Sequence, residues 1–275
     1  TIGGINALAH FFAWGRQIIG GIPWELFCRS ARETGQTIPD PGFTKDNAGP
    51  GHLYVDRGIF PAICDDAVIN SGADLMFHAM PASVQFVDNG WNLSVCAKEG
   101  LKQTRAKVLI DATGDANAVQ IAGLEVNRYQ VVQPATLTIM CSGYDPKLLD
   151  FDRLRMEAGR AVEKGELKST DVSWRNDGPR AFLVKFGHNA NHIHSEGADS
   201  SEGKTGVEVE ARRAVLRAYR FLRKQPGLEK LRIDWICPET GIRETVTIKG
   251  KYTVTKKEYL AGKKFDDALC YAFYP

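Results

Sequence analysis

The sequence predicts a strand at residues 104–111 that ends in a glycine turn at residues 112–116. The segment Val-Leu-Ile at residues 108–110 shows no alternation of apolar and polar residues, which is typical of a strand buried on both faces. It continues through Ala-Thr-Gly-Asp-Ala at residues 112–116 into a helical pattern at residues 117–122. A buried strand, a glycine turn and a helix in this order predict a sheet covered by helices.

An antiparallel meander precedes this strand. Residues 83–87 and 91–96 each alternate between apolar and polar side chains, and Asn89-Gly90 between them is a strong signal for a hairpin turn. A helix capped by Asp56 and a short apolar strand at residues 73–79 come before it. The region that contains this helix, strand, meander and buried strand carries the clearest secondary-structure signals in the sequence.

The remaining elements divide into two groups. We predict further helices at residues 7–19, 23–29, 149–164, 207–224 and 256–260, and further strands at residues 135–141, 181–186, 232–236 and 245–249. The character of the sequence changes near Gln130, after which strands become more frequent. We therefore predict two domains, residues 1–130 and 131–275, with a mixed α/β (α+β) fold whose second domain is β-rich.

The composition excludes several classes of partner. Hydrophobic residues make up 43% of the 275 residues and charged residues 25%, as in an ordinary globular protein. The 35 basic residues nearly balance the 33 acidic ones, so no broad basic surface is available for nucleic acid. No apolar stretch approaches the roughly 20 residues that span a bilayer. We expect neither a nucleic-acid nor a membrane partner; oligomeric state is left open.

Six cysteines are scattered along the chain without a C-x-x-C pair: Cys28, Cys64, Cys96, Cys141, Cys237 and Cys270. Most have apolar neighbours, which favours free thiols in a reducing compartment, with the cytoplasm preferred. The chain begins at Thr1 without an initiator Met, and any leader would lie upstream. We expect it to be a piece of a longer polypeptide.

The turn at residues 113–115 is the first candidate for chemistry. Gly114 allows a ligand to approach the backbone, and Thr113 and Asp115 place polar groups at the end of the predicted strand. The helix that follows would favour a phosphate at its N-terminus. The alternative is a tight strand-to-helix turn in which Asp115 only caps the helix.

Three histidines, His188, His192 and His194, lie within seven residues. Glycine and asparagine neighbours predict a loop, and a loop does not give the spacing of helical metal ligands, so we predict no metal site. Two readings remain, a substrate-cleft loop in which His192 donates a proton, and ordinary packing or surface histidines. The arginine-rich face of residues 212–224 is interpreted as a solvated helix face rather than an RNA or phosphate site.

These segments together resemble the FAD-dependent oxidoreductase family, flavoproteins with two dinucleotide folds of the glutathione reductase type. The motifs that carry the resemblance cover nearly the whole chain. They are Asp-Ala-Thr-Gly-Asp-Ala at residues 111–116, Gln-Pro-Ala-Thr at residues 133–136, Asn-His-Ile at residues 191–193, the helix start at residues 210–213, Gly-Ile-Arg-Glu-Thr at residues 241–245, Gly-Lys-Tyr at residues 250–252 and Phe-Asp-Asp at residues 265–267.

The resemblance implies a partial Rossmann-like FAD/NAD(P)-binding domain with an inserted meander, FAD as cofactor and a small-molecule substrate that exchanges a hydride or electron pair with it. It also implies roles for particular residues. Gly3 and Gly4 would approach the flavin, Ala82 the adenine, and Thr113, Gly114 and Asp115 would line the cofactor cleft. Arg243 would be a cation near the isoalloxazine that stabilises a reduced flavin or a substrate carboxylate. Arg243 and His192 are the two candidate catalytic residues.

The chain departs from the family pattern in ways that matter for function. It contains no G-x-G-x-x-G motif and lacks the family's closing segment, so we expect it to be the central part of the protein and to bind FAD weakly or not at all by itself. Val246 follows Thr245 where a second arginine is usual, and residues 3–7 lack the common Thr or Ser. The alternative function is a binding or assembly module that keeps the fold without the cofactor.

Overall fold

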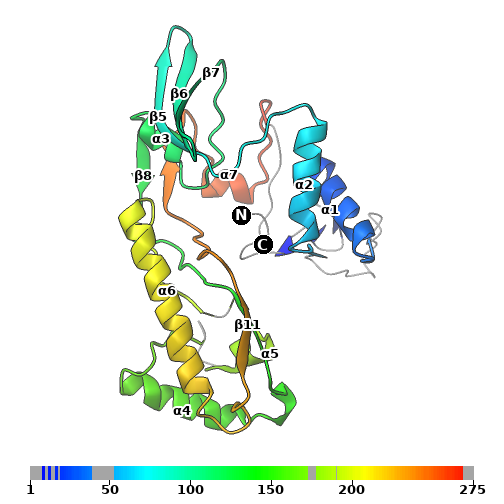
Figure 1. The fold of residues 1–275 in the computed structure, drawn as a ribbon, viewed down its shortest axis with the longest axis vertical. Helices are drawn as coiled ribbons and strands as arrows, with labels where there is room; N and C mark the ends of the chain where they lie inside the picture. Colours follow the sequence, from blue (N-terminus) through cyan, green and yellow to red (C-terminus); the bar gives the residue numbers. More distant parts are fainter. Residues whose placement is uncertain are drawn as a thin grey trace. The chain divides into compact units, whose positions relative to one another are not determined.

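The computed structural model describes residues 8–9, 12–13, 16–17, 19–38, 53–172, 178–189 and 191–268, and Figure 1 shows their helices and strands. The chain forms two compact units. The first combines residues 1–77 with residues 251–275, and the second consists of residues 78–250. The domain boundary expected near Gln130 stays a prediction.

The first unit contains two packed helices, α1 (Gly21–Glu33) and α2 (Ile59–Asn70). Its small core lies mainly on α1, where Phe27, Cys28 and Ala31 pack with Leu53. The expected capping of α2 is confirmed, because Asp56 Oδ1 accepts hydrogen bonds from the N–H groups of Gly58 and Ile59.

The helix expected at residues 7–19 is wrong. Short antiparallel pairs occur instead, β1 (Leu8–Ala9) with β4 (Leu53–Tyr54) and β2 (Phe12–Ala13) with β3 (Arg16–Gln17). The segment contains three aromatic residues, Phe11, Phe12 and Trp14, which favour strands, and Gly15, which favours a turn over helix. The spacing of its apolar residues alone therefore does not predict the secondary structure of this segment.

The helix predicted at residues 256–260 is confirmed as α7 (Lys256–Leu260), the last helix in the described part of this unit. A capping box joins Thr255 and Glu258 at its start. Lys263 Nζ donates to Glu258 Oε1 at 2.6 Å and lies 4.8 Å from the centre of the Phe265 ring. Hydrogen bonds from Lys263 and from the Tyr252 hydroxyl lower the pKa of Glu258 to about 2. The family-like motifs near the end of the chain thus make a local structural cluster.

The meander in the second unit is confirmed. Strands β5 (Met80–Val87), β6 (Gly90–Ala97) and β7 (Gly100–Ala106) pair in succession, all antiparallel. The first turn consists of Asp88 and Asn89, both with positive φ, so Gly90 belongs to β6 rather than to the turn. The register shifts between Pro81 and Ser83, so Ala82 lies at a β-bulge.

The strand expected at residues 73–79 is wrong, and of the strand expected at residues 104–111 only residues 104–106 are confirmed, as the end of β7. Residues 73–79 and 108–111 belong to no sheet within the described residues, and Val108 and Ile110 are 73% and 82% exposed. A strand buried on both faces needs neighbouring strands and covering helices, which an apolar run does not itself supply. Every sheet in the described chain is small and antiparallel, compatible with a mixed α/β fold. The Rossmann-like sheet stays a prediction.

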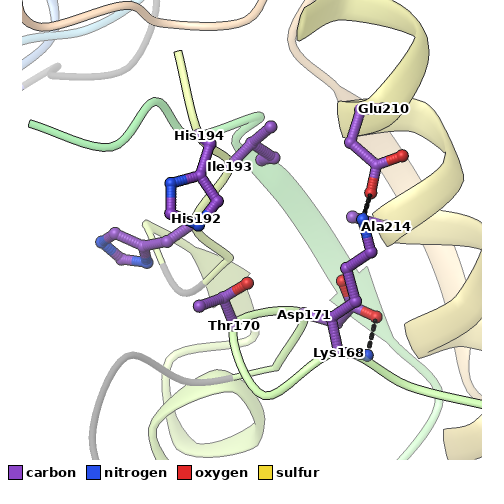
Figure 2. Close-up of a pocket in the computed structure, with 8 residues that line it drawn as sticks. All are labelled: Lys168, Thr170, Asp171, His192, Ile193, His194, Glu210 and Ala214. Carbon is purple, nitrogen blue, oxygen red and sulfur yellow. Dashed lines mark hydrogen bonds and ion pairs between the residues drawn. The ribbon is translucent and has the colours of Figure 1, made fainter. Parts of the chain in front are cut away.

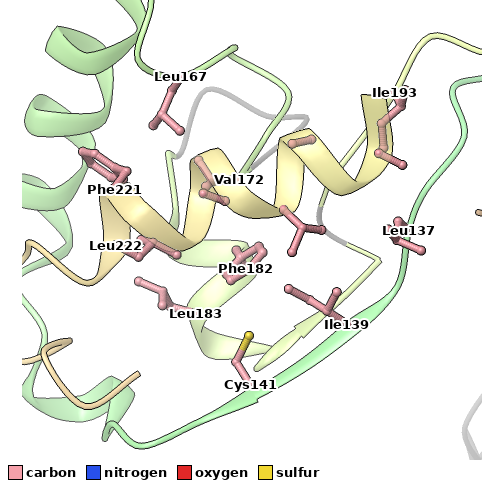
Figure 3. Packing of buried hydrophobic residues seen from close by; sticks show 14 of the residues in the cluster. Leu137, Ile139, Cys141, Leu167, Val172, Phe182, Leu183, Ile193, Phe221 and Leu222 are labelled. Carbon is pink, nitrogen blue, oxygen red and sulfur yellow. The ribbon is translucent and has the colours of Figure 1, made fainter. Parts of the chain in front are cut away.

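The rest of the second unit surrounds one larger core. Strand β9 (Ile139–Ser142) lies between β10 (Gly187–His188) and β11 (Arg232–Ile236), and β8 (Val126–Arg128) pairs with β12 (Val246–Ile248). The helical elements are α3 (Asn117–Ile121), the 3₁₀ turn η1 (Pro146–Leu148), α4 (Phe151–Glu163), α5 (Arg180–Val184) and α6 (Ser201–Leu222). Figure 3 shows buried side chains of α5, α6 and β9 packed together.

Two expectations for this region need correction. The strand expected at residues 181–186 is mostly the helix α5, in which Phe182 and Leu183 are buried. The β-rich character expected of the second half is also wrong, because three helices pack with a single three-stranded sheet. A short, mostly apolar segment of six residues fits a buried helix turn as well as a buried strand, so periodicity cannot separate the two.

The expectation of free cysteine thiols agrees with the described residues. The five described cysteines are free thiols, and burial raises the pKa of Cys141 to about 12. Among the helices that the structure describes, none has the length and apolar character to cross a bilayer.

Candidate functional site

Arg243 joins segments that are far apart in the sequence. Its Nη1 donates to the carbonyl oxygen of Pro134, and its Nη2 lies 3.0 Å from Thr136 Oγ1 and 2.6 Å from Asn189 Oδ1. The Gln-Pro-Ala-Thr motif and the Gly-Ile-Arg-Glu-Thr motif therefore meet at one guanidinium group. We call Arg243, Thr136 and Asn189 the arginine cluster.

Main-chain hydrogen bonds hold these motifs in register. Thr136 exchanges two N–H···O bonds with Gly241, at 3.1 and 2.9 Å, and Ala135 exchanges two with Ile193, at 2.8 and 2.9 Å. Glu244 Oε2 also accepts the Gln133 N–H at 3.0 Å. Residues 133–136 thus form the extended centre of the site, with a motif on each side.

Asn191 fixes the loop that carries His192. Only 1% of Asn191 is exposed. Its side chain accepts the Leu137 N–H at 3.1 Å and donates to the Leu137 carbonyl at 2.9 Å, as a paired strand would. Because both amide atoms are used in this pairing, Asn191 has a structural role.

The glycine turn is tied to the same site. Thr245 Oγ1, two residues after Arg243, donates to Asp115 Oδ1 at 2.8 Å. The Asp-Ala-Thr-Gly-Asp-Ala motif and the arginine loop are therefore connected by a direct side-chain contact. This connection brings Asp115, predicted to line the cofactor cleft, to the segment that carries Arg243.

Hydrogen bonds inside the turn settle how α3 begins. Asp111 accepts from Thr113 Oγ1 at 2.7 Å and from the Val119 N–H at 3.1 Å, and Thr113 Oγ1 accepts the Asn117 N–H at 3.0 Å. Burial alone would raise the pKa of Asp111, but these hydrogen bonds lower it overall. The alternative in which Asp115 caps the helix is wrong, and the phosphate role expected for the helix start loses its basis, because Asp111 and Thr113 already satisfy these amides.

The other cofactor-binding candidates have different surroundings. Gly114 has φ +83°, and no atom lies within 4 Å of the position that a Cβ would occupy. Ala82 is exposed at the β5 bulge. Gly3 and Gly4 lie outside the described residues. Of this set, Gly114 and Ala82 present backbone that a ligand can approach.

His192 lies beside a small pocket of about 90 Å³ (Figure 2). The main-chain N–H of His192 donates to the main-chain carbonyl oxygen of Thr170 at 2.9 Å. Burial, assisted by the positive charge of Arg243, lowers the pKa of His192 to about 4. At neutral pH the imidazole is therefore uncharged, and the role of His192 as a proton donor stays a prediction.

The opposite wall of the pocket is charged. Asp171, 1% exposed, accepts two hydrogen bonds from Arg217 at 2.8 and 2.9 Å, and Glu210 accepts from Arg217 at 2.8 Å and from Lys168 at 2.7 Å. Figure 2 shows the rings of His192 and His194 across the pocket from Lys168 and Glu210. Arg217, expected on a solvated helix face, is therefore part of a paired network.

In the described part of the chain, no three His, Cys, Asp or Glu side chains are grouped so that they could hold a metal ion. His188 belongs to β10, whereas His192 and His194 line the pocket. The three histidines are thus divided between two local environments.

A titration tests the environment of His192. Since its pKa is lower in the folded protein than the ordinary 6.5, the unfolded chain binds more protons between pH 6.5 and 4. Its contribution to stability is present above pH 6.5 and is lost as the pH falls to about 4. We expect the imidazole NMR signal to titrate near pH 4, and somewhat higher in Arg243→Gln. A midpoint near 6.5 in the wild type would show that the ring is solvated.

Sequence reasoning missed several residues of this site. Thr136 and Asn191 lie in motifs that resemble the family, but no feature of the sequence indicated which hydrogen bonds their side chains make. Asn189 and the pairing of Asp171 with Arg217 had no sequence signal, because they depend on contacts across more than 40 residues. A run of three residues with positive φ, Phe186, Gly187 and His188, also precedes Asn189, and only the glycine could have suggested it.

Comparison with known proteins now identifies the family. The family model described as FAD dependent oxidoreductase matches residues 1–275. No curated protein and no solved structure matches the chain. The match spans the segments that meet at Arg243 and Thr245, namely those of Thr136, Asn189 and Asp115. The chain belongs to the FAD-dependent oxidoreductase family.

Proposed function

We propose that the protein passes a hydride or electron pair between FAD and a small organic substrate, and that the arginine cluster forms part of the site for that exchange. The observation that carries the proposal is the convergence of family motifs on Arg243 and Thr245. FAD is the cofactor that the family implies, and when bound it supplies the redox chemistry.

The described residues fit this cofactor at the glycine turn. The backbone at Gly114 is open, with nothing within 4 Å of a Cβ position, and a dinucleotide can approach it closely. Asp115 is held in place by Thr245. We assign the cofactor-facing surface to Thr113, Gly114 and Asp115, with Ala82 at the neighbouring strand.

The substrate side is assigned to Arg243 and His192. The guanidinium provides a fixed positive charge, held by Thr136 and Asn189, that stabilises negative charge on a bound molecule. His192 is uncharged at neutral pH, so it can orient a substrate by donating or accepting a hydrogen bond. This division places charge stabilisation on Arg243 and orientation on His192.

Two glycine variants test the cofactor surface. Gly114→Ala and Gly123→Ala both place a Cβ at a positive φ, +83° and +73°, with no atom within 4 Å. Both changes carry the same backbone strain, about 1 kcal/mol. We expect only Gly114→Ala to weaken FAD binding, by roughly tenfold or more, because its Cβ faces the cofactor. Binding is measured by flavin fluorescence titration of the protein as the cell makes it.

Equal FAD affinity in the two variants would remove Gly114 from the cofactor surface. In the same titration, residues 1–275 alone serve as a further sample. We propose weak binding for them, since the sequence contains no G-x-G-x-x-G phosphate loop. A submicromolar dissociation constant for that sample would contradict this part of the proposal.

A further inference from the structure

The backbone just before Asn189 adopts an uncommon conformation. Phe186, Gly187 and His188 have φ values of +54°, +97° and +50° in succession. Non-glycine residues rarely adopt this region, and clusters of such residues occur where function requires a fixed geometry. A Cβ at Gly187 would lie 2.7 Å from the Ile139 carbonyl oxygen, so the close pairing of β10 with β9 sets this path. This backbone path brings the side chain of Asn189 into contact with the guanidinium group of Arg243.

The contacts of Asn189 define which way its amide faces. Oδ1 lies 2.6 Å from Arg243 Nη2 and 2.8 Å from Thr136 Oγ1. If the amide were rotated, its NH₂ group would face the guanidinium donor at 2.6 Å, which is a repulsive contact between two donors. The oxygen therefore points to Arg243, and the nitrogen points away from it.

The amide nitrogen of Asn189 is presented outward. Asn189 is exposed, whereas Thr136 beneath it is fully buried and the neighbouring Asn191 nearly so. Within the described residues no hydrogen bond from Asn189 Nδ2 is found. A side chain held by its oxygen while its two N–H groups face solvent has the geometry of a preorganised donor.

The charge next to this donor favours an anion. Arg243 carries a permanent positive charge at the same point, and Glu244, the next residue, is turned to the Gln133 main chain. His192 adds no charge of its own at neutral pH. A neutral carbonyl would use the donor but gain little from the charge, whereas a carboxylate uses both.

We propose that Asn189 Nδ2, beside the Arg243 guanidinium, binds a carboxylate group of the substrate. This inference rests on the proposed function and narrows it to substrates that carry a carboxylate. Asn189 is then a specificity-determining residue. The arginine holds it in place and adds the field that selects an anion over a neutral group.

Asn189→Asp is the most informative variant. It keeps an oxygen that accepts from Arg243 and replaces the outward NH₂ group with a second oxygen, so a donor becomes a repelling acceptor. Asn92→Asp, an exposed asparagine on β6 in the same unit, is the matched control. Asn189→Ser, which removes the amide without adding charge, provides a second test should the Asp variant fail to fold.

Acetate serves as the probe, and acetamide as its neutral counterpart of the same shape. Their binding is followed without FAD, through the NMR shifts of the Thr136 and Gly241 main-chain amides, so a failure to bind flavin does not affect the readout. We expect saturable shifts with acetate. Affinity for acetate should fall at least about tenfold in Asn189→Asp and in Asn189→Ser, and stay unchanged in Asn92→Asp. Acetamide should bind the wild type at least about tenfold more weakly than acetate.

Three outcomes would overturn the proposal. They are the absence of any acetate shift in the wild type, equal acetate affinity in the wild type and the Asn189 variants, and equal affinity for acetate and acetamide. The first two remove the site, and the third removes the preference for a carboxylate. Flavin binding is measured separately and tests the proposed function.

Discussion

Asp171→Asn should lower the free energy of unfolding by about 3 kcal/mol. Asp171 is 1% exposed and accepts two hydrogen bonds from Arg217 and one from the Lys168 N–H. The substitution places an NH₂ group against these donors and leaves the Arg217 charge partly buried. Glu210 still contacts Arg217, so we expect a loss at the lower end of the range for broken buried pairs.

A surface ion pair supplies the control for this variant. Arg160 and Glu157 are paired at 2.8 Å but are 63% and 34% exposed, so Glu157→Gln should cost less than about 0.5 kcal/mol. Urea unfolding of both variants gives the comparison. Stability of Asp171→Asn within about 0.5 kcal/mol of the wild type would show that the pair does not hold the 168–171 turn, and with it the backbone of His192.

Gly143→Ala should be at least as damaging, with an expected loss of about 3 kcal/mol or more. Gly143 follows β9 with φ +89°, and a Cβ there would lie 2.0 Å from the Lys230 carbonyl oxygen. Since the obstacle is backbone, one of the two chain segments must move. That movement would disturb the pairing of β9 with β11, which begins at Arg232.

The matched control separates this clash from backbone strain. Gly165, after α4, has φ +73° and no atom within 4 Å of a Cβ position. Gly165→Ala should therefore cost only the strain of a left-handed residue, about 1 kcal/mol. Equal thermal and urea stability of the two variants would argue against the close approach of Gly143 and Lys230.

The parts of the fold that could be predicted are those with local signals. The meander has alternating strands and a marked turn, and the helix expected at residues 207–224 has an apolar face, so both are confirmed, although α6 begins earlier, at Ser201. The prediction of a buried strand at residues 108–111 failed because the burial of a strand depends on neighbouring elements that its own sequence does not encode. The strand prediction for residues 181–186 failed because a six-residue segment with five apolar residues is too short to distinguish helix from strand.

The residues of the candidate site could be predicted where they lie in sequence motifs. Arg243, Thr136 and Asp115 lie in motifs, and the structure connects them as members of one network. Asn189 was missed because its role depends on a strained turn and a contact with a residue 54 positions away. The charge state of His192 also required structure, because it reflects burial and a neighbouring guanidinium. Motifs thus indicated the place of the site, and long-range contacts determine its chemistry.

The central claim is flavin-linked redox chemistry, and the most direct test is the visible absorption spectrum of the protein as the cell makes it. The purified protein is incubated with FAD, and the unbound cofactor is removed. We predict a retained flavin spectrum that is bleached on reduction and restored on oxidation. Absence of retained flavin after this reconstitution would contradict the account and favour a binding or assembly module that keeps the fold without the cofactor.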